Sequence, residues 1–561
     1  MPSMVGAVAP RTTAFGWLEK TILAFTVVGV ALRIWQYIAA TSLWVDELAV
    51  AQNVISRPLP QLLFNPLAWD QVAPKGFLAA EKLCITLFGA NEFGLRLFPL
   101  LCSIAAVVIF AQVSRIVLGR GAPIAVLLFS VAGPLIDYAA RVKQYSTDVA
   151  AAVLLLWLAL QLQHREQLGR RLLHVAGGVG AIVAWFSQPA ILVLAGLGIA
   201  LFLIELNKGG AARALQLWPL LAWWGISAAA VAAASYASVT AETRNALVTT
   251  YDYWRSGLPP NTLWAAVGHL WPLNQISGLI ARGGQSSLAY PFAHVVLLFI
   301  FAGAGLLFRR SWPTALLVLA PVVVAILAAV ARQYPFSDRL ILFLLPGLFL
   351  ALAEAIYWTY RQIARRSPLA GAAALALCMF PGVVPILKEP PPWRIDDVKA
   401  VLAYLQQERR SGDVIYIYYD AVPAVSFYGS QFGLGRSEYI TGGCHRGDAR
   451  AYLSEIDRLR GGSRVWIFLL AAHTGHQLHQ DLLEYLGSLG KRQDSFLAQS
   501  RTINGPGLAA ELYLYDLSRS LAPDAPADGA KIAADPDYIS CDIGPTAMVR
   551  AAQAGALFAD R

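Results

Sequence analysis

The sequence predicts an α-helical polytopic membrane protein with an extramembrane α/β domain toward its C-terminal end. Of its 561 residues, 57% are hydrophobic and only 14% are charged, whereas soluble globular chains carry about 25% charged residues. Apolar runs close to the roughly 20 residues that cross a bilayer recur through residues 1–390. After Pro390–Pro392, short apolar strands alternate with amphipathic helices, which is typical of an α/β domain.

The apolar part of the chain divides into about eleven predicted spans. The first is too long for the apolar core of a signal peptide, so we expect it to be retained. Residues 76–90 are too short and too charged to span, and they predict a helix in the membrane interface. The predicted spans lie near residues 18–40, 95–118, 121–137, 145–163, 171–186, 188–206, 214–238, 291–308, 312–331, 340–359 and 368–387.

Lys and Arg residues predict the orientation of these spans. They gather in alternate short loops, for example at Arg309 and Arg310, and cytoplasmic loops are enriched in such cations. The N-terminus is then cytoplasmic, and an odd number of spans places the C-terminus and the long loops 41–94 and 239–290 outside. Because the cations are scattered over short loops, the net charge of +9 does not indicate a nucleic-acid partner.

Residues 391–520 are the predicted soluble α/β domain on the outer face. Strands are expected within DVIYIYY, RVWIFLL and ELYLYDL, with helices between them. This alternation predicts a parallel, doubly wound sheet. No glycine-rich phosphate loop follows these strands, so no nucleotide site is assigned. The tail, residues 521–561, is rich in Ala, Asp and Pro and is expected to be poorly ordered.

The chain has five cysteines, without the spacing of a metal site. Cys444 and Cys541 would both lie in an oxidising compartment, where a disulfide could tie the tail to the domain. Cys84, Cys102 and Cys378 lie in or at predicted spans and read as small core residues.

Two adjacent carboxylates, Asp46 and Glu47, follow the first span in the stretch SLWVDELAV. One interpretation is structural, with Asp46 capping a helix that runs through AVAQNVISR. The other, compatible with the first, is catalytic: Asp46 faces a cavity at the outer membrane surface and acts as a general base for a hydroxyl acceptor, with Glu47 beside it. Desolvation near lipid would raise the pKa of such a carboxylate toward the useful range.

Cations stand in outer loops where membrane topology alone would not place them. Lys75 opens a helix after Ala73–Pro74, where an ammonium and backbone N–H groups can share an anion. A guanidinium such as Arg339 matches a phosphate bidentately, and headgroup anchoring is the alternative for both residues. Asp148, one turn inside a predicted span, is a functional candidate by default, unless it only pairs with a nearby cation. The candidate phosphate ligands are Lys75, Arg141, Lys143 and Arg339, and the cations that could pair with Asp148 are Lys143 and Arg141.

Three further residues are expected to support such a site. Asp70 precedes the first of these cations in the loop 41–94, and Tyr334 begins a stiff Tyr-Pro turn before the last of them. Trp254, in the aromatic loop 239–290, suits a sugar face or a lipid chain. Together the candidates describe one site, at which acids and cations converge on the outer leaflet.

Five stretches resemble, in this order, the GT-C fold glycosyltransferases that use polyprenyl-phosphate sugars, in the bacterial branch of protein O-mannosyltransferases and lipid A aminoarabinose transferases. They are LWVDELAV, DQVAPKGFLAAEKL, NEFGLRLFP, DYAARVKQYSTD and YPFSDRLILFLLP, within residues 42–346. The acidic pair after the first span is the most specific of them. The hydropathy pattern extends the likeness to about residue 390.

The resemblance implies an inverting displacement at the anomeric carbon of a polyprenyl-phosphate sugar, with a hydroxyl acceptor of the cell envelope. By position in the matching stretches, Asp46 is the implied base. The implied contacts of the carrier phosphate are Lys75, Lys143 and Arg339. Tyr145 lies beside Lys143 in the matching stretch. The resemblance further implies a multi-pass protein of the bacterial inner (plasma) membrane, in contact with membrane lipids, whose C-terminal domain is periplasmic or extracellular.

One departure from the family pattern lies at Arg141, where many relatives carry a glutamate two residues before the cation of that turn. Arg141 adds a positive charge and argues against an acid or metal role there. Many family members need no metal, and some bind a divalent cation at the acidic loop. A divalent cation at the first outer loop of this chain is therefore an open prediction, and no metal ligands are assigned.

Other function classes remain as alternatives. A transporter or flippase of a lipid-linked sugar would need acids and cations along a path through the bundle, whereas here the charges gather at one face. A receptor or scaffold would explain the α/β domain but not the loop charges. His473, His476 and His479 have helical spacing, for which a solvated first turn is favoured over a metal site.

Overall fold

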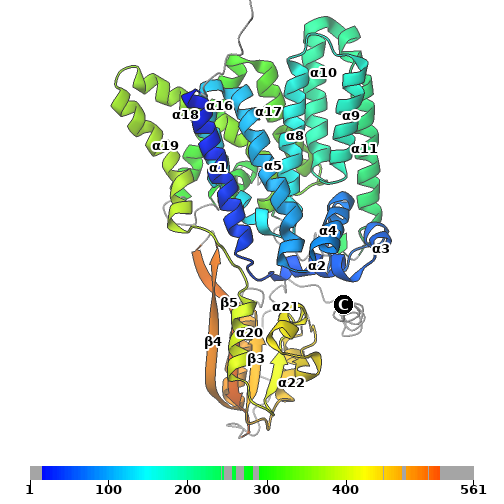
Figure 1. Ribbon diagram of the computed structural model, residues 1–561, viewed down its shortest axis with the longest axis vertical. Coiled ribbons are helices and arrows are strands. Elements are labelled where there is room, and N and C mark those ends of the chain that lie inside the picture. Colours follow the sequence, from blue (N-terminus) through cyan, green and yellow to red (C-terminus); the bar gives the residue numbers. More distant parts are fainter. Residues whose placement is uncertain are drawn as a thin grey trace, which may run out of the picture.

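The computed structural model of the chain describes residues 16–241, 243–244, 256–260, 271–281, 290–445, 448–470, 476–502 and 505–518. In these residues, a bundle of long helices carries an α/β domain at one end (Figure 1). The predicted fold class is therefore confirmed.

The long helices of the bundle overlap each of the eleven predicted spans. Among the described residues, eight helices are long and apolar enough to cross a membrane, so the chain is a multi-pass membrane protein. The count of eleven stays a prediction, since α9, for example, has only 15 residues. The bundle contains α1 (Trp17–Ile38), α5 (Glu92–Leu118), α6 (Ala122–Val131), α7 (Gly133–Asp137), α8 (Tyr145–Gln163), α9 (Arg170–Ala184), α10 (Ala190–Leu215), α11 (Trp218–Ala237), α16 (Tyr290–Arg310), α17 (Trp312–Val330), α18 (Leu345–Ala364) and α19 (Pro368–Lys388).

Short helices lie at the end of the bundle that faces the domain (Figure 1). The predicted helix of residues 76–90 is confirmed as α4, and its place in the membrane interface stays a prediction. The loop 239–290, which looked nearly structureless in sequence, contains a helix of 11 residues, α15. These elements are α2 (Val45–Ser56), α3 (Leu59–Phe64), α4 (Lys75–Phe88), α15 (Trp271–Ala281) and the 3-10 helix η3 (Asp338–Leu344).

A buried arginine closes the break between α6 and α7. Pro134 at the start of α7 cannot continue the backbone hydrogen bonds of α6. Arg33 of α1 donates to the freed carbonyls of Ser130 and Phe129 at 3.2 and 3.3 Å, and to the hydroxyl of Ser103 in α5 at 2.8 Å. The break between α6 and α7 is thereby tied to α1 and α5.

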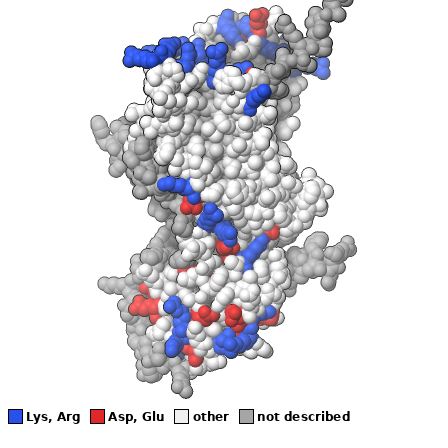
Figure 2. Space-filling view, turned by 60° about the vertical axis from the view of Figure 1, so that its left-hand side comes forward, with Lys and Arg blue, Asp and Glu red and all other residues white. Residues whose placement is uncertain are grey.

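Charge is distributed unevenly over the surface in Figure 2. The middle of the bundle is uncharged on this face, whereas both of its ends carry charged side chains. Lys and Arg gather at the end opposite the domain, and acids and cations mix near the domain. An uncharged middle is what a protein surrounded by lipid requires.

The C-terminal domain is a five-stranded sheet in the order β2-β1-β3-β5-β4. β1 pairs in parallel with β2 and β3, but β5 runs antiparallel to β3 and to β4. The predicted all-parallel sheet is therefore wrong for one half, and β4 was not predicted at all. The domain contains α20 (Val398–Glu408), β1 (Val414–Ile417), α21 (Val422–Tyr428), β2 (Ile440–Thr441), α22 (Ala449–Asp457), β3 (Val465–Leu469), α23 (His476–Leu489), β4 (Lys491–Thr502) and β5 (Gly505–Asp516).

The start of the domain is bonded to the bundle. Where the chain leaves α19, the main-chain N–H of Trp393 donates to Gln36 Oε1 at 2.7 Å, and Gln36 Nε2 donates back to the carbonyl of Trp393 at 2.9 Å. Cys444 is disulfide-bonded, while its predicted partner, Cys541, and the predicted disordered tail lie outside the described residues. The other three cysteines are free.

Candidate functional site

Asp46 and Glu47 lie in the first turn of α2, directly after the link from α1. Trp44 has an extended backbone and is the residue that precedes the helix, so the predicted capping role of Asp46 is wrong. Glu47 Oε2 accepts the N–H of Trp44 instead, at 3.3 Å. Both acids also lie in the first turn of the helix, where the helix dipole favours negative charge.

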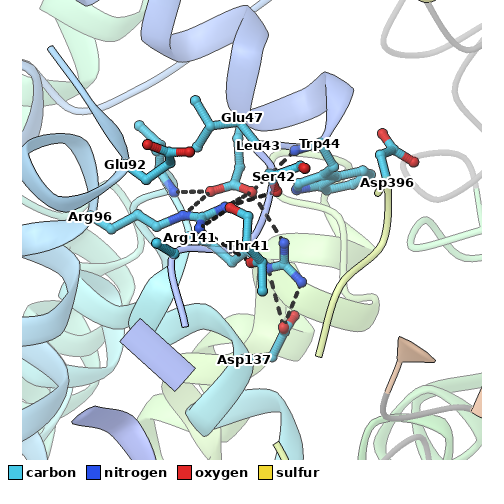
Figure 3. A network of polar contacts seen from close by, with 12 residues as sticks. Thr41, Ser42, Leu43, Trp44, Glu47, Glu92, Arg96, Asp137, Arg141 and Asp396 are labelled. Carbon is cyan, nitrogen blue, oxygen red and sulfur yellow. Dashed lines mark hydrogen bonds and ion pairs between the residues drawn. The ribbon is translucent and has the colours of Figure 1, made fainter. Parts of the chain in front are cut away.

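Glu47 is fully buried and joins three segments of the chain (Figure 3). Arg96 of α5 donates to its two oxygens at 2.9 and 2.8 Å. From the turn before α8, Arg141 donates to it at 3.2 Å and the N–H of Val142 at 2.9 Å. On its other side, Arg141 donates to Asp137 at 3.1 and 2.8 Å.

This network occupies the carboxylate of Glu47 and buries the guanidinium of Arg141 between Glu47 and Asp137, with side-chain exposures of 0% for Glu47 and 1% for Arg141. Five donors share the two carboxylate oxygens of Glu47, which offer about four lone-pair sites. The geometry therefore argues against Glu47 as a catalytic group and against Arg141 as a phosphate ligand. Both belong to a rigid framework beneath Asp46.

Asp46 lies beside this framework and is held by two other cations. Lys143 Nζ lies 2.9 Å from Asp46 Oδ1, and Arg339 Nη1 lies 2.8 Å from Asp46 Oδ2. Lys143 also donates to Gln71 Oε1 at 2.7 Å. The side chain of Asp46 is 18% exposed, whereas that of Glu47 is 0% exposed. Residues of three segments that are distant in sequence thus meet at a carboxylate that keeps partial exposure.

Aromatic rings flank the guanidinium of Arg339. Its central carbon lies 5.7 Å from the ring centre of Tyr145 and 5.8 Å from that of Trp44. Tyr145 packs edge-on against Tyr138 at 4.8 Å. The rings favour the positive charge and limit the space around it.

The two acids are both ionised more readily than an ordinary carboxyl group. Burial alone would raise the pKa of Asp46, but the charges of Lys143 and Arg339 outweigh it and lower this pKa. Burial is likewise outweighed at Glu47, where Arg96 and Arg141 lower the pKa. The predicted upward shift for Asp46 is therefore wrong in this state, because the two cations contribute more than desolvation does.

Two predicted residues of the first outer loop lie apart from the Asp46 pair. Lys75 begins α4, and its pKa is lowered by burial and by the charge of Arg57; the two cations form a positive patch. Asp70 has a left-handed backbone (φ 49°) and accepts a hydrogen bond from Thr243 Oγ1 at 3.0 Å, which joins the first outer loop to the segment after α11.

The remaining predicted residues have other neighbours. The hydroxyl of Tyr334 donates to the carbonyl of Leu340 at 2.8 Å and so stabilises the turn before α18. Asp148 is buried in α8, and its predicted pairing is wrong, because Lys143 bonds to Asp46 and Arg141 to Glu47 and Asp137. Trp254 lies outside the described residues.

Sequence reasoning missed two members of the site. Arg96 lies in the quoted stretch NEFGLRLFP, and an arginine in the first turns of a span is a signal in itself. Gln71 lies in the quoted stretch DQVAPK, but a glutamine carries no charge and stood out by no pattern. Neither residue can be assigned its partner from sequence, because those partners are far away along the chain.

A divalent cation does not fit the first outer loop as it stands. Metal ions need free carboxylate oxygens, but the oxygens of Asp46 and Glu47 face ammonium and guanidinium groups. Within the described ranges, no group of three or more His, Cys, Asp or Glu side chains could hold a metal ion. His479 bonds to Glu511 at 2.5 Å, and His473 lies outside those ranges.

No family model and no curated protein matches this chain. Solved structures do. ArnT from Cupriavidus metallidurans in the apo state is 12% identical over 90% of this chain and 99% of that chain, with a TM-score of 0.46. The same protein bound to undecaprenyl phosphate is 13% identical over the same shares, with a TM-score of 0.47.

An oligosaccharyltransferase from Archaeoglobus fulgidus, in complex with zinc and sulfate, is also similar. It is 14% identical over 87% of this chain and 73% of that chain, with a TM-score of 0.45. These proteins are distant from the chain in sequence and in backbone geometry. The functional inference therefore rests on the residues of its own site.

Proposed function

We propose that this chain is a membrane glycosyltransferase of the GT-C type. It moves a sugar from a polyprenyl-phosphate carrier to a hydroxyl acceptor of the cell envelope, by inverting displacement at the anomeric carbon. Asp46 is the general base, and Lys143 and Arg339 bind the phosphate of the donor. Lys75, in its positive patch with Arg57, is the proposed further contact of the carrier phosphate.

The observation that carries this proposal is the pairing of Asp46 with two cations, Lys143 and Arg339, which reach its carboxylate from distant parts of the chain. A donor phosphodiester brings a negative charge of its own, and it competes with Asp46 for Lys143 and Arg339. Once the phosphate shares these cations, they stabilise the Asp46 carboxylate less, so its pKa rises. The base therefore gains proton affinity only when the donor is bound.

The reaction is balanced by groups of the site. An acceptor oxygen bonds to the anomeric carbon while its proton moves to the Asp46 carboxylate. The bond from that carbon to the phosphate oxygen breaks, and its electron pair leaves with the phosphate. Lys143 and Arg339 stabilise the second negative charge that develops there, and a positioned base contributes about 10²–10⁴-fold.

The membrane side follows from charge and redox chemistry. Lys and Arg gather at the end of the bundle opposite the domain in Figure 2, as they do at cytoplasmic ends. Cys444 is disulfide-bonded, which fits an oxidising compartment outside the cytoplasm. The site and the C-terminal domain then face the periplasm or the exterior, with the N-terminus cytoplasmic, and the bacterial inner membrane is the proposed location.

Undecaprenyl phosphate binding to the purified chain in lipid nanodiscs tests the competition. Asp46→Asn should bind this carrier about 10-fold more tightly than the wild type, because a competing charge worth roughly 1.4 kcal/mol is removed. Lys143→Met should bind the carrier at least about 10-fold more weakly than the wild type. Asp413→Asn is the matched control, since it breaks an acid–cation pair with Arg464 (2.7 Å) in the outer domain. Equal or weaker binding by Asp46→Asn would contradict the competition.

Transfer is tested in membranes with a panel of radiolabelled undecaprenyl-phosphate hexoses and pentoses. The wild type should convert at least one of them to a labelled envelope product, and Asp46→Asn should convert none. A wild type that carries a labelled donor across proteoliposomes and forms no product would favour the transporter class and overturn the enzyme.

A further inference from the structure

We propose that the C-terminal domain is part of the catalytic centre, because it fixes the start of α2. Asp396 and Tyr428 are then positioning residues for Asp46. This inference rests on the proposed function of Asp46, but the contacts that carry it lie elsewhere, in the link between α1 and α2. The link is residues 39–44, and α2 begins with Val45.

Two side chains of the domain bond the main chain on either side of Trp44. The hydroxyl of Tyr428 accepts the N–H of Leu43 at 2.8 Å, and Asp396 Oδ2 accepts the N–H of Val45 at 3.2 Å. Tyr428 and Asp396 are both buried. If either acceptor is removed, its main-chain N–H loses a hydrogen bond that water cannot readily replace, and this loss costs free energy. The residue that follows Val45 is the proposed base.

Lys399 at the start of α20 extends the same contact. Its N–H donates to Ser42 Oγ at 3.2 Å, and its ammonium donates to the carbonyl of Ala40 at 2.9 Å. The ammonium also forms an ion pair with Glu92, the first residue of α5. One residue of the domain thus holds the link and the bundle together.

The bundle holds the link from the opposite side. Arg96, which binds Glu47, also donates to the carbonyls of Thr41 and Ser42 at 2.7 and 3.2 Å. Figure 3 places Asp396 next to Trp44 and the Arg96–Glu47 pair on the other side of the link. Main-chain groups of the link are therefore bonded in turn to the bundle and to the domain.

Apolar side chains of α2 also pack against the domain. Leu48 of α2 belongs to one buried cluster with Val401 of α20 and Val425 of α21. Val45 of α2 belongs to a second cluster with Tyr416 of β1. Since Lys143 and Arg339 are carried by the bundle, the distance from Asp46 to these cations depends on where the domain holds α2. A misplacement of about 1 Å can cost 10²-fold in rate.

Hydrogen–deuterium exchange of the full chain in nanodiscs tests this inference without any substrate. Tyr428→Phe keeps the ring but removes the acceptor of the Leu43 N–H, so exchange in residues 40–47 should rise several-fold. The matched control is Tyr404→Phe, which removes a hydroxyl that donates to Asp494 at 2.6 Å inside the domain. The control should leave residues 40–47 protected. Equal protection of these residues in Tyr428→Phe and the wild type would overturn the proposal.

Asp396 gives an independent variant, should Tyr428→Phe fail to fold. Asp396→Ala should raise exchange at the start of α2, whereas Asp396→Asn, which keeps an oxygen acceptor, should restore most of the protection. Protection that does not differ between these two variants would also contradict the positioning role.

Kinetics separate positioning from a general loss of stability. With whichever labelled donor the wild type accepts, Tyr428→Phe should lower kcat by about 2- to 10-fold, the size of one hydrogen bond, and leave the donor KM unchanged. An unchanged kcat despite lost protection would overturn the link to Asp46. If the wild type transfers no donor, the proposed function fails, while the exchange data still decide whether the domain fixes α2.

Discussion

Asp46 and Glu47 are neighbours in sequence and each is bound by two cations, but their surroundings differ in kind. The carboxylate of Glu47 is closed off by five donors from three segments and has no exposure. The carboxylate of Asp46 meets two side chains and remains 18% exposed. Glu47 is part of the framework, whereas Asp46 keeps partial exposure beside Lys143 and Arg339, the two cations that the proposed donor would share.

The contrast between Glu47 and Asp46 shows how a chain can hold a partly exposed acid in place at the end of a membrane bundle. A fully bonded buried ion pair is costly to break but contributes little that a substrate could use. A partly exposed pair keeps its ligands in place and still exchanges them. Because Glu47 stands on the same helix turn as Asp46, its network with the bundle contributes to the position of Asp46, together with the contacts that the domain makes at the start of α2.

The largest expected effect comes from breaking the closed network. Arg96→Ala leaves Glu47 buried with an incomplete set of donors and should lower the free energy of unfolding by about 3–5 kcal/mol, measured by thermal or denaturant unfolding in detergent. Arg115→Ala is the control, because the Arg115–Glu19 pair is half exposed and surface pairs contribute little. Equal stability of Arg96→Ala and Arg115→Ala would contradict the closed network, because Glu47 would then depend on its cations no more than an exposed acid does.

A smaller effect, with a distinct pH dependence, is expected at the exchangeable pair. Asp46→Asn should lower the free energy of unfolding by about 2 kcal/mol at neutral pH, since a charged hydrogen-bond acceptor is lost. The pKa of Asp46 is lowered in the folded chain, so its contribution is complete above the ordinary value of about 4 and is lost as the pH falls below it. Unfolding curves of both proteins between pH 3 and pH 8, roughly the range that spans this value, measure the difference. A difference that grew toward acidic pH would contradict the assignment.

The smallest effect concerns another acid of the same loop, Glu81 of α4, for which the described part of the chain supplies no ion-pair partner. It is buried, and neither of its carboxyl oxygens has a hydrogen-bond partner among the described residues. Burial, and then the charge of Glu47, raise its pKa well above the ordinary value. Glu81→Leu should therefore raise the free energy of unfolding by about 1 kcal/mol, because an unpaired polar group is removed.

The sign of the pH dependence at Glu81 is opposite to that at Asp46. A raised pKa means that the folded chain binds a proton that the unfolded chain releases, so wild-type stability falls as the pH rises above about 4. Glu81→Leu should lack this slope, and a lower stability of this variant at neutral pH would show that the carboxyl group has a partner.

The sequence was sufficient to predict the membrane class, the α/β domain and the three residues that meet at Asp46, namely Asp46 itself, Lys143 and Arg339. Their charge at an outer membrane boundary was the signal. The roles of Glu47 and Arg141 could not be read, because no local pattern pairs Glu47 with residues 49 and 94 positions away. The direction of β5 was hidden for a related reason: ELYLYDL is apolar enough to be buried whichever way its neighbour runs. β4, mostly exposed, offered no apolar run at all.

The reciprocal bonds between Gln36 and Trp393 have a consequence for the making of the protein. The two residues are 357 positions apart, so α1 has left the ribosome long before its partner is made, since synthesis proceeds from the N-terminus. Until the domain has been made, the link between α1 and α2 lacks its partners Asp396, Lys399 and Tyr428. Under the proposed function, we therefore expect a chain that stops short of the domain to insert in the membrane and to remain inactive.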